Sequence, residues 1–304
     1  MLSTQPDPAA RAESTQPDPA ARAEAMSLQI AELQHLVEQQ TQQLDELGVE
    51  LGRRAASRQA AAASDSVTAK LYYFGGRGNS QQARWALAAA GIPYVSVRLS
   101  TAADFDALRV AGKLTYGPSS LPDNIGNVPM LEDGDHCFSQ SLTIVRHAAR
   151  RGKLYGATDV DAARIDEVID GIKDARGAIV AYPFCDAHEA CALHAQAIKR
   201  FFPCFEGVLA RNTQPPFAVG SALTMADVLL AELVESTQEA FAQTLGEQAA
   251  EQVLSPYPLL RTLHARVLTL TAIVNFKASA NWMPFPAGQV GKEYAEHVRA
   301  ALGP

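Results

Sequence analysis

The sequence predicts an α/β domain followed by an all-helical domain, both preceded by an extension that cannot build an aromatic core. All of its Phe, Trp and Tyr residues lie beyond Ser66. β-rich runs alternate with helical segments over residues 67–156, and helical periodicity alone continues over residues 157–304. A chain of 304 residues is long enough to bury a sizeable core in one or two domains.

The extension divides into two parts. Residues 1–25 hold the segment STQPDPAARAE in tandem. We expect disorder there, because Pro-Asp-Pro blocks helix propagation and the other residues are mostly small or charged. Residues 26–66 are predicted to be a helical or coiled-coil segment that ends in a linker, Arg53–Ser66. The predicted coiled-coil seam alternates steps of three and four over Ile30, Leu33, Val37, Gln40, Leu44, Leu47 and Leu51. This seam predicts that residues 30–51 form a coiled coil with a partner. The alternative is that the segment is a single amphipathic helix packed on the globule.

Residues 67–156 are predicted to fold as βαβ and then ββα. The predicted strands are Lys70–Phe74, Pro93–Leu99, Val128–Glu132 and a segment at Cys137 and Phe138. Helices are predicted over Asn79–Ala90, over the DFDALRV stretch and from Ser141. The first two strands need the helix between them as a crossover if they are parallel.

Residues 157–304 are predicted to be helical. One long helix presents an apolar face made of Ile165, Val168, Ile169, Ile172 and Ile179. Another presents Leu193, Ile198, Phe201, Phe202, Phe205 and Leu209. The sequence Thr224-Met225-Ala226-Asp227 predicts a capping box at the start of a further helix. This last motif is a folding signal and carries no chemistry.

Composition narrows the function classes. A net charge of −7 disfavours general binding to nucleic acid. No apolar run is long enough to span a membrane, so we expect a cytoplasmic protein with no membrane partner. The four cysteines lack CxxC spacing, which agrees with a reducing compartment. The seven histidines form no HxxxH or HExxH set, so we expect no metal site.

Three segments carry a family resemblance. KLYYFGGRGNSQQARWALAAAGIPY, NVPMLEDGDHCFSQSLTIVRHAARRGKLYG and SALTMADVLL, in this order, resemble the cytosolic glutathione transferases, in particular the alpha, mu and sigma group that uses a tyrosine. The resemblance spans residues 70–270. It implies a thioredoxin-like first domain, an all-helical second domain and a homodimer. It also implies glutathione as co-substrate, no metal, and a small hydrophobic electrophile as the second substrate, which the thiolate of glutathione conjugates or reduces.

The chemistry of this family requires the thiol of glutathione to be held as a thiolate, because an ordinary thiol with a pKa near ~8.5 is mostly protonated at neutral pH. Tyr73 matches the family tyrosine in the K-L-x-Y-F frame, whose hydroxyl donates a hydrogen bond to the sulfur. The side chain of Tyr72 is expected to point to the opposite face of the sheet. Taken without the resemblance, both tyrosines are typical of strand packing.

The resemblance also assigns residues that bind glutathione. It implies a cis bond before Pro129, so that the backbone of Val128 pairs with the cysteinyl backbone of the tripeptide. Gln140 and Ser141 are expected to bind the γ-glutamyl end at a helix N-terminus. From the residues alone, Val-Pro is an ordinary turn, and Ser141 is an ordinary helix cap.

Three further residues are assigned by resemblance. Arg109 matches a cation that pairs with the glycine carboxylate of glutathione, and Asn127 stands where many relatives have a Gln that contacts the same end. Asp174 matches an acid that reaches across the dimer to the γ-glutamyl amine bound by the partner. Its alternative role is a solvated helix acid.

One departure from the alpha-class pattern leaves other functions open. The alpha class places an arginine close to the thiolate at the position that Asn79 occupies here. Thiol activation that depends on Tyr73 alone is expected to be weaker, and Arg77 is expected to support the fold. The alternatives are a non-catalytic scaffold that uses the coiled coil, and a sigma-like prostaglandin isomerase.

The electrophile pocket is expected between the two domains. Its predicted walls are the Gly75-Gly76 loop, the helix around Ala178–Phe184 and the tail Ala280–Phe285. Trp282, Met283 and Phe285 are suited to an apolar lid. A tail packed against the domain is equally compatible with the sequence.

Overall fold

The computed structural model describes residues 68–110, 128–214 and 216–302, with the side chains of Arg109 and Leu302 left out. The predicted repeat 1–25, the predicted helical segment 26–66 and Asn127 lie outside the described residues.

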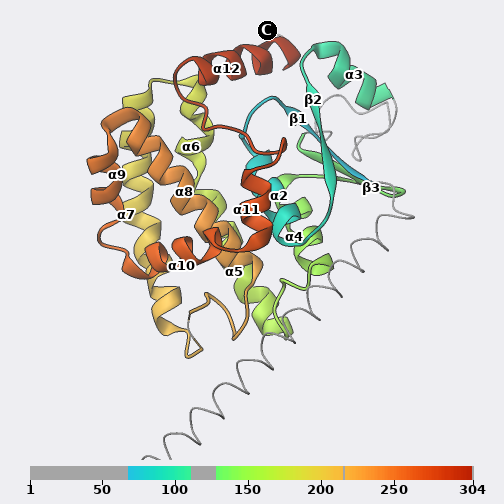
Figure 1. Ribbon diagram of the computed structural model, residues 1–304. Coiled ribbons are helices and arrows are strands. Elements are labelled where there is room, and N and C mark those ends of the chain that lie inside the picture. The colour runs from blue at the N-terminus through green and yellow to red at the C-terminus, as the bar shows by residue number, and fades with distance from the viewer. Residues whose placement is uncertain (1–67, 111–127, 215, 303–304) are drawn as a thin grey trace, which may run out of the picture. The chain divides into compact units, whose positions relative to one another are not determined.

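A four-stranded mixed sheet with strand order β2-β1-β3-β4 forms the first part of the fold (Figure 1). β1 pairs parallel with β2 and antiparallel with β3, and β3 pairs antiparallel with β4. The elements are β1 (Ala69–Phe74), α2 (Ser80–Ala89), β2 (Tyr94–Leu99), α3 (Ala102–Val110), β3 (Met130–Asp133), β4 (His136–Ser139) and α4 (Ser141–Arg151). The predicted order of βαβ and then ββα is therefore confirmed.

The strands of the sheet contribute to two buried clusters. Leu71 belongs to one cluster together with Trp85 of α2, whereas Tyr72 belongs to a second cluster together with Phe105 of α3. The first cluster is continuous with the core of the helical domain. The second is small and contains Tyr73 together with three residues of the last helix, Tyr294, Val298 and Ala301.

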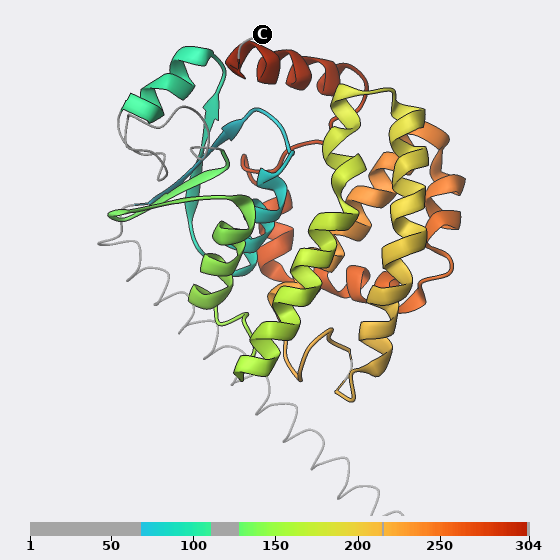
Figure 2. The same ribbon diagram turned by 180° about the vertical axis from the view of Figure 1, so that it is seen from behind.

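The second part of the fold is helical, as predicted (Figure 2). Its elements are α5 (Asp159–Ala175), α6 (Gly177–Ala181), the 3₁₀ helix η1 (Tyr182–Phe184), α7 (Ala187–Arg211), α8 (Met225–Leu245), α9 (Glu247–Leu254), α10 (Pro258–Leu268), α11 (Thr271–Lys277) and α12 (Gly288–Leu302). Helix α8 is buried over most of its length and contacts α5, α7, α9 and α10. A helix that is apolar on nearly all sides is expected at the centre of a bundle.

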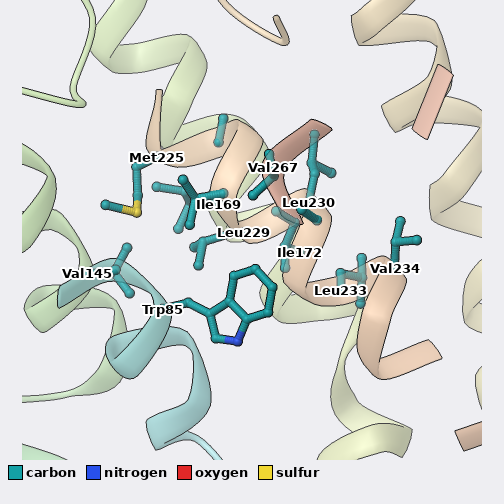
Figure 3. Packing of buried hydrophobic residues seen from close by; sticks show 14 of the residues in the cluster. Trp85, Val145, Ile169, Ile172, Met225, Leu229, Leu230, Leu233, Val234 and Val267 are labelled. Atoms are coloured by element: carbon teal, nitrogen blue, oxygen red, sulfur yellow. The ribbon is translucent and has the colours of Figure 1, made fainter. Parts of the chain in front are cut away.

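Trp85 joins the core of the sheet domain to that of the helical domain. Its side chain is fully buried, and Figure 3 shows it among Leu229 and Leu233 of α8 and Ile172 of α5. A second contact, with the ring of Phe276 at a centroid distance of 6.3 Å, comes from α11. Burial of a side chain of this size contributes about 3 kcal/mol or more, so that the sheet and the helices are held in a fixed relation.

The helical pattern was predicted with two errors. The apolar face assigned to one long helix is split, because α5 ends at Ala175 and Ile179 belongs to the short helix α6. Gly177, a poor helix former, marks the break. On α7, Leu193 lies outside the buried face and is 49% exposed. The apolar periodicity alone assigned Leu193 to the buried face. In the 25-residue helix α7, however, contacts with other helices decide which side chains are buried, and they cover only part of each turn.

The predicted capping box at the start of α8 is formed. The carboxylate of Asp227 accepts the backbone N–H of Thr224 at 2.7 Å. It also accepts the N–H of Ala218 at 2.6 Å, so that it fixes the preceding loop as well as the helix end. Burial raises the pKa of this carboxyl, and the hydrogen bonds oppose that rise.

Helix α12 spans the two parts of the fold. It contacts η1 of the helical part, and it also contacts α3 and β1 of the sheet part (Figures 1 and 2). Its inward face consists of Tyr294, Ala295, Val298 and Ala301, spaced as one stripe of an amphipathic helix. At its exposed edge, Nδ1 of His297 lies 2.8 Å from Nη2 of Arg98 on β2.

Candidate active site

The strand register brings three chain segments to one edge of the sheet. Tyr72 of β1 pairs with Met130 of β3, and Met130 pairs with Ser139 of β4. The end of β1, the start of β3 and the end of β4 therefore meet at the same edge. Loops that follow or precede these positions can place polar groups around one ligand.

Five of the predicted site residues lie at this edge. Tyr73 is the penultimate residue of β1, and its side chain is 6% exposed. The Val128–Pro129 peptide bond is cis, as the resemblance implies, and β3 follows it directly. Gln140 is the N-cap of α4, and Ser141 is its first residue. The structure therefore brings together residues that the sequence separates by up to 68 positions.

The hydroxyl of Tyr73 is held by two donors. The backbone N–H of Asn79, just before α2, donates to it at an N–O distance of 3.0 Å. The hydroxyl of Tyr294 on α12 donates to it at an O–O distance of 3.4 Å. Asn79 therefore supplies a main-chain donor at the position where the resemblance to the alpha class would place an arginine side chain.

The N-terminus of α4 is suited to an anion. The side chain of Gln140 does not cap the helix, and the first turn holds no acidic residue. Free N–H groups and the positive end of the helix dipole favour a carboxylate at such a position. Gln140 has a φ of 74°, a conformation that a non-glycine residue rarely adopts and that is common where a site fixes the backbone.

Of the three remaining predicted residues, the structure describes the side chain of Asp174 alone. Arg109 is on α3, and the structure does not describe its side chain. Asn127 lies outside the described residues. Asp174 is on α5 of the helical part, where its side chain is exposed.

Arg77 supports the fold, as expected. Its guanidinium donates from both terminal nitrogens to the carboxylate of Glu239 on α8, and its Nε donates to the carbonyl oxygen of Met283 at 2.8 Å. The same group lies 4.8 Å from the ring centroid of Trp282. With these partners, Arg77 links the loop after β1 to the helical part of the fold and to the tail.

A second arginine lies behind the site. Arg84 of α2 is 2% exposed, and its Nη1 donates to the carbonyl oxygen of Gly76 at 2.8 Å. Burial lowers the pKa of this guanidinium, while the nearby phenols of Tyr94, Tyr73 and Tyr294 act in the opposite direction. Sequence reasoning gave this cation no role at the site.

The expected electrophile pocket is nearly filled in this structure. The cavity between the sheet part and the helical part is lined by Gly78, Val180, Pro183 and Phe285, among others, and has a volume of about 10 Å³. That is room for about one water molecule. Of the three residues suited to a lid, Phe285 lines the cavity, whereas the ring of Trp282 packs on Trp85 and Phe276 in the core. For Trp282, the alternative of a packed tail is therefore correct.

Tyr294 is the residue that sequence reasoning missed. It is separated from Tyr73 by 221 positions and lies beyond the segments that carry the resemblance. The available signal was the stripe of Tyr294, Ala295, Val298 and Ala301, which predicts a helix with one buried face. The stripe does not say which part of the fold that face covers.

The described residues form neither a metal cluster nor a membrane-spanning helix. Among residues 68–110, 128–214 and 216–302, no group of three or more His, Cys, Asp or Glu side chains is arranged to hold a metal ion. In the same ranges, no helix combines the length and the apolar character that crossing a membrane requires.

The fold and the site edge define the class of protein. The family model described as "Glutathione S-transferase, N-terminal domain" matches residues 69–150, and the one described as "Glutathione S-transferase, C-terminal domain" matches residues 173–280. The fold resembles the solved structure of NaGST-2, with a TM-score of 0.56 and 23% identity over 70% of this chain and 96% of that one. It also resembles a pi-class glutathione S-transferase of Onchocerca volvulus, with a TM-score of 0.59 and 22% identity over 74% and 99% of the two chains.

Curated relatives match over most of their length. Glutathione S-transferase alpha-4 of Rattus norvegicus is 31% identical over 241 residues, which cover 78% of this chain and 98% of the relative. Glutathione S-transferase A1 of Homo sapiens is 33% identical over 68% of this chain and 86% of its own. The chain belongs to the glutathione S-transferase family.

Proposed function

We propose that this protein is a glutathione transferase that joins the sulfur of glutathione to hydrophobic electrophiles, and that Tyr73 stabilises the thiolate. The observation that carries the proposal is the hydroxyl of Tyr73, which is held by two donors at the sheet edge beside the cis-proline and the α4 N-terminus. Both donors occupy its oxygen, so its own proton is available to a sulfur bound within hydrogen-bond distance.

The thiol is activated by preferential stabilisation of its charged form. A hydrogen bond from Tyr73 to the sulfur is stronger when the sulfur carries a negative charge. Each unit by which the pKa of the thiol falls requires about 1.4 kcal/mol of such preference. A lowering by about two units makes the thiolate the main form at pH 7.

The tripeptide is proposed to bind along the sheet edge. The backbone of Val128 pairs with the cysteinyl backbone, in the manner of an added strand. Gln140, Ser141 and the N-terminus of α4 hold the γ-glutamyl carboxylate. Arg109 and Asn127 are proposed to bind the glycine carboxylate.

The bond-forming step needs no further cofactor. The thiolate attacks an electrophilic carbon and forms a carbon–sulfur bond while a leaving group such as chloride departs with its electron pair. The electrophile is proposed to bind at the cavity between the two parts of the fold. Since this cavity has room for about one water molecule, side chains that line it have to move before an electrophile can enter.

The experiment is turnover of a chloronitroarene with glutathione by the full chain, with retention on immobilised glutathione measured alongside. Retention and thiol-dependent turnover support the transferase. A partner that is captured stably and lost on deletion of residues 1–66, in a protein without turnover, supports the non-catalytic scaffold. Conversion of a prostaglandin endoperoxide in the absence of conjugation supports the isomerase.

Three further properties belong to the proposal. A homodimer is expected for this family, and Asp174 is then proposed to reach the γ-glutamyl amine bound by the partner. A coiled-coil partner through residues 30–51 and a cytoplasmic location also stay predictions. Light scattering of the full chain and of a chain without residues 1–66 tests the homodimer and whether residues 30–51 add a further association.

A further inference from the structure

Tyr294 occupies a place that two glycines keep open for it. A Cβ atom added at Gly76 would collide with the ring of Tyr294, and one added at Gly78 would collide with the hydroxyls of both Tyr294 and Tyr73. Both glycines lie in the loop that connects β1 to α2. The loop after the catalytic strand is therefore shaped to accept a side chain from the last helix of the chain.

The hydroxyl of Tyr294 is buried in apolar surroundings. Tyr294 is 3% exposed and belongs to a cluster with Phe74, Leu99, Met130 and Val298. Within the described part of the chain, the hydrogen-bond partner of its hydroxyl is Tyr73. A buried hydroxyl with no partner costs about 1–3 kcal/mol, so phenylalanine would fill this space at lower cost if packing were the whole role of the residue.

The hydroxyl of Tyr294 is the donor in the pair, and the oxygen of Tyr73 accepts. Burial raises the pKa of the Tyr294 phenol, and the contact with Tyr73 raises it further. Tyr294 therefore keeps the proton that it donates over the pH range of the reaction. The oxygen of Tyr73 then accepts from Tyr294 as well as from the backbone of Asn79.

We propose that Tyr294 is a positioning residue for thiol activation: it donates to the oxygen of Tyr73, directs the proton of Tyr73 toward the sulfur and makes Tyr73 a stronger donor. Hydrogen bonds in a chain polarise one another, so a donor to the oxygen of Tyr73 strengthens the bond from Tyr73 to the sulfur. This chain has Asn79 where the alpha class has a cationic side chain, and a second phenol supplies part of the missing stabilisation. The inference rests on the proposed function.

The size of the effect is set by the geometry. An O–O distance of 3.4 Å is long for a hydrogen bond between hydroxyls, and catalytic contacts of this kind often shorten when substrate binds. We therefore expect the contribution of one ordinary hydrogen bond, equivalent to a factor of about 3–10. Removal of Tyr73 itself is expected to cost more.

The test is Tyr294→Phe in the full chain, with bound glutathione titrated through the ultraviolet absorbance of its thiolate. The midpoint for ionisation of the thiol is expected to rise by about 0.5–1 pH unit. Below that midpoint, kcat for a chloronitroarene is expected to fall about 3–10-fold. Affinity for glutathione should stay the same at low pH, where the bound sulfur is a thiol, and should fall by about the same 3–10-fold at high pH, where it is a thiolate. In a Tyr73→Phe background, Tyr294→Phe should cause no further shift, because Tyr294 acts through Tyr73.

Two further variants distinguish the effect of losing the Tyr294 hydroxyl from the effect of a general loosening of helix α12. His297→Ala removes the contact of the same helix with Arg98 and should leave the thiol midpoint in place. Site-specific 3-fluorotyrosine at position 294, a more acidic phenol of nearly the same size, should shift the midpoint downward. This variant keeps the test possible even if Tyr294→Phe does not fold.

The outcomes distinguish the inference from the function on which it rests. Wild-type protein without glutathione-dependent turnover overturns the proposed function. Active wild-type protein overturns the inference alone in three cases: if Tyr294→Phe has the wild-type midpoint, if the shift is equally large in the Tyr73→Phe background, or if His297→Ala reproduces it.

Discussion

The guanidinium of Arg77 and the carboxylate of Glu239 form a bidentate ion pair, although the two residues are 162 positions apart in the chain. The side chain of Arg77 is 5% exposed and that of Glu239 is 30% exposed. Arg77 comes from the loop between β1 and α2, and Glu239 comes from helix α8. The pair therefore fixes this loop to the helical part of the fold.

Glu239→Gln should destabilise the protein by about 2–3 kcal/mol, because it leaves the buried guanidinium of Arg77 without its counter-charge. The free energy of unfolding in urea at pH 7 measures the effect. Glu167→Gln is the matched control, since Glu167 pairs with Arg164 where both side chains are 66% exposed, and its cost should stay within about 0.5 kcal/mol. Equal losses in the two variants would refute the role given to Arg77.

His194 should make the fold sensitive to mild acid. Its side chain is 1% exposed, and its Nε2 lies 2.8 Å from Oγ1 of Thr237. Burial, with a smaller effect of Arg176, lowers the pKa of His194 to about 4. In the unfolded chain this histidine therefore binds a proton below pH ~6.5, whereas in the folded chain it binds one only near pH 4. The stability that is present above pH ~6.5 is lost as the pH falls toward 4.

Between pH 7.5 and 5, His194 should lower the free energy of unfolding by about 2 kcal/mol. Urea unfolding of the wild type and of His194→Gln at the two pH values isolates this contribution. The variant is expected to start from lower stability at pH 7.5 and to lose about 2 kcal/mol less on acidification. A variant with the same pH dependence as the wild type would show that His194 is already protonated or is not the responsible group.

Gln140→Gly should separate stability from affinity. Glycine adopts the φ of 74° found at this position without a steric penalty, so the variant should be as stable as the wild type or slightly more stable. It also lacks the amide proposed to bind the γ-glutamyl end, so KM for glutathione should rise about 5–10-fold with little change in kcat. Thermal unfolding and steady-state kinetics give the two quantities. An unchanged KM would remove Gln140 from the binding site.

The sequence predicted the sheet well, because its signals are local. Residues 70–74 and 93–99 are β-rich runs with a helix between them, and the capping box at Thr224 can be read within four residues. The site edge could be predicted only through the resemblance. The spacing between Tyr73, Pro129 and Gln140 has no meaning until the register of β1, β3 and β4 is known.

What could not be predicted depends on contacts between distant segments. Leu193 fits an apolar stripe, yet whether that side of α7 is covered is decided by other helices. Trp282 suits a lid, but its half-buried ring packs against Trp85 of the core. The contact of Tyr294 with Tyr73 joins the last helix to the first described strand, and no local pattern encodes such a pairing.

The measurement that tests the central claim most directly is the ionisation of glutathione bound to the wild type and to Tyr73→Phe, followed by thiolate absorbance against pH. In the wild type the midpoint should lie about one to two units below the ordinary thiol pKa of ~8.5, and in Tyr73→Phe it should return close to that value. Turnover near neutral pH should fall about 8–25-fold in the variant, because a smaller fraction of the bound sulfur is then thiolate. The same midpoint in both proteins would contradict the account, because the hydroxyl of Tyr73 would then have no part in making the sulfur anionic.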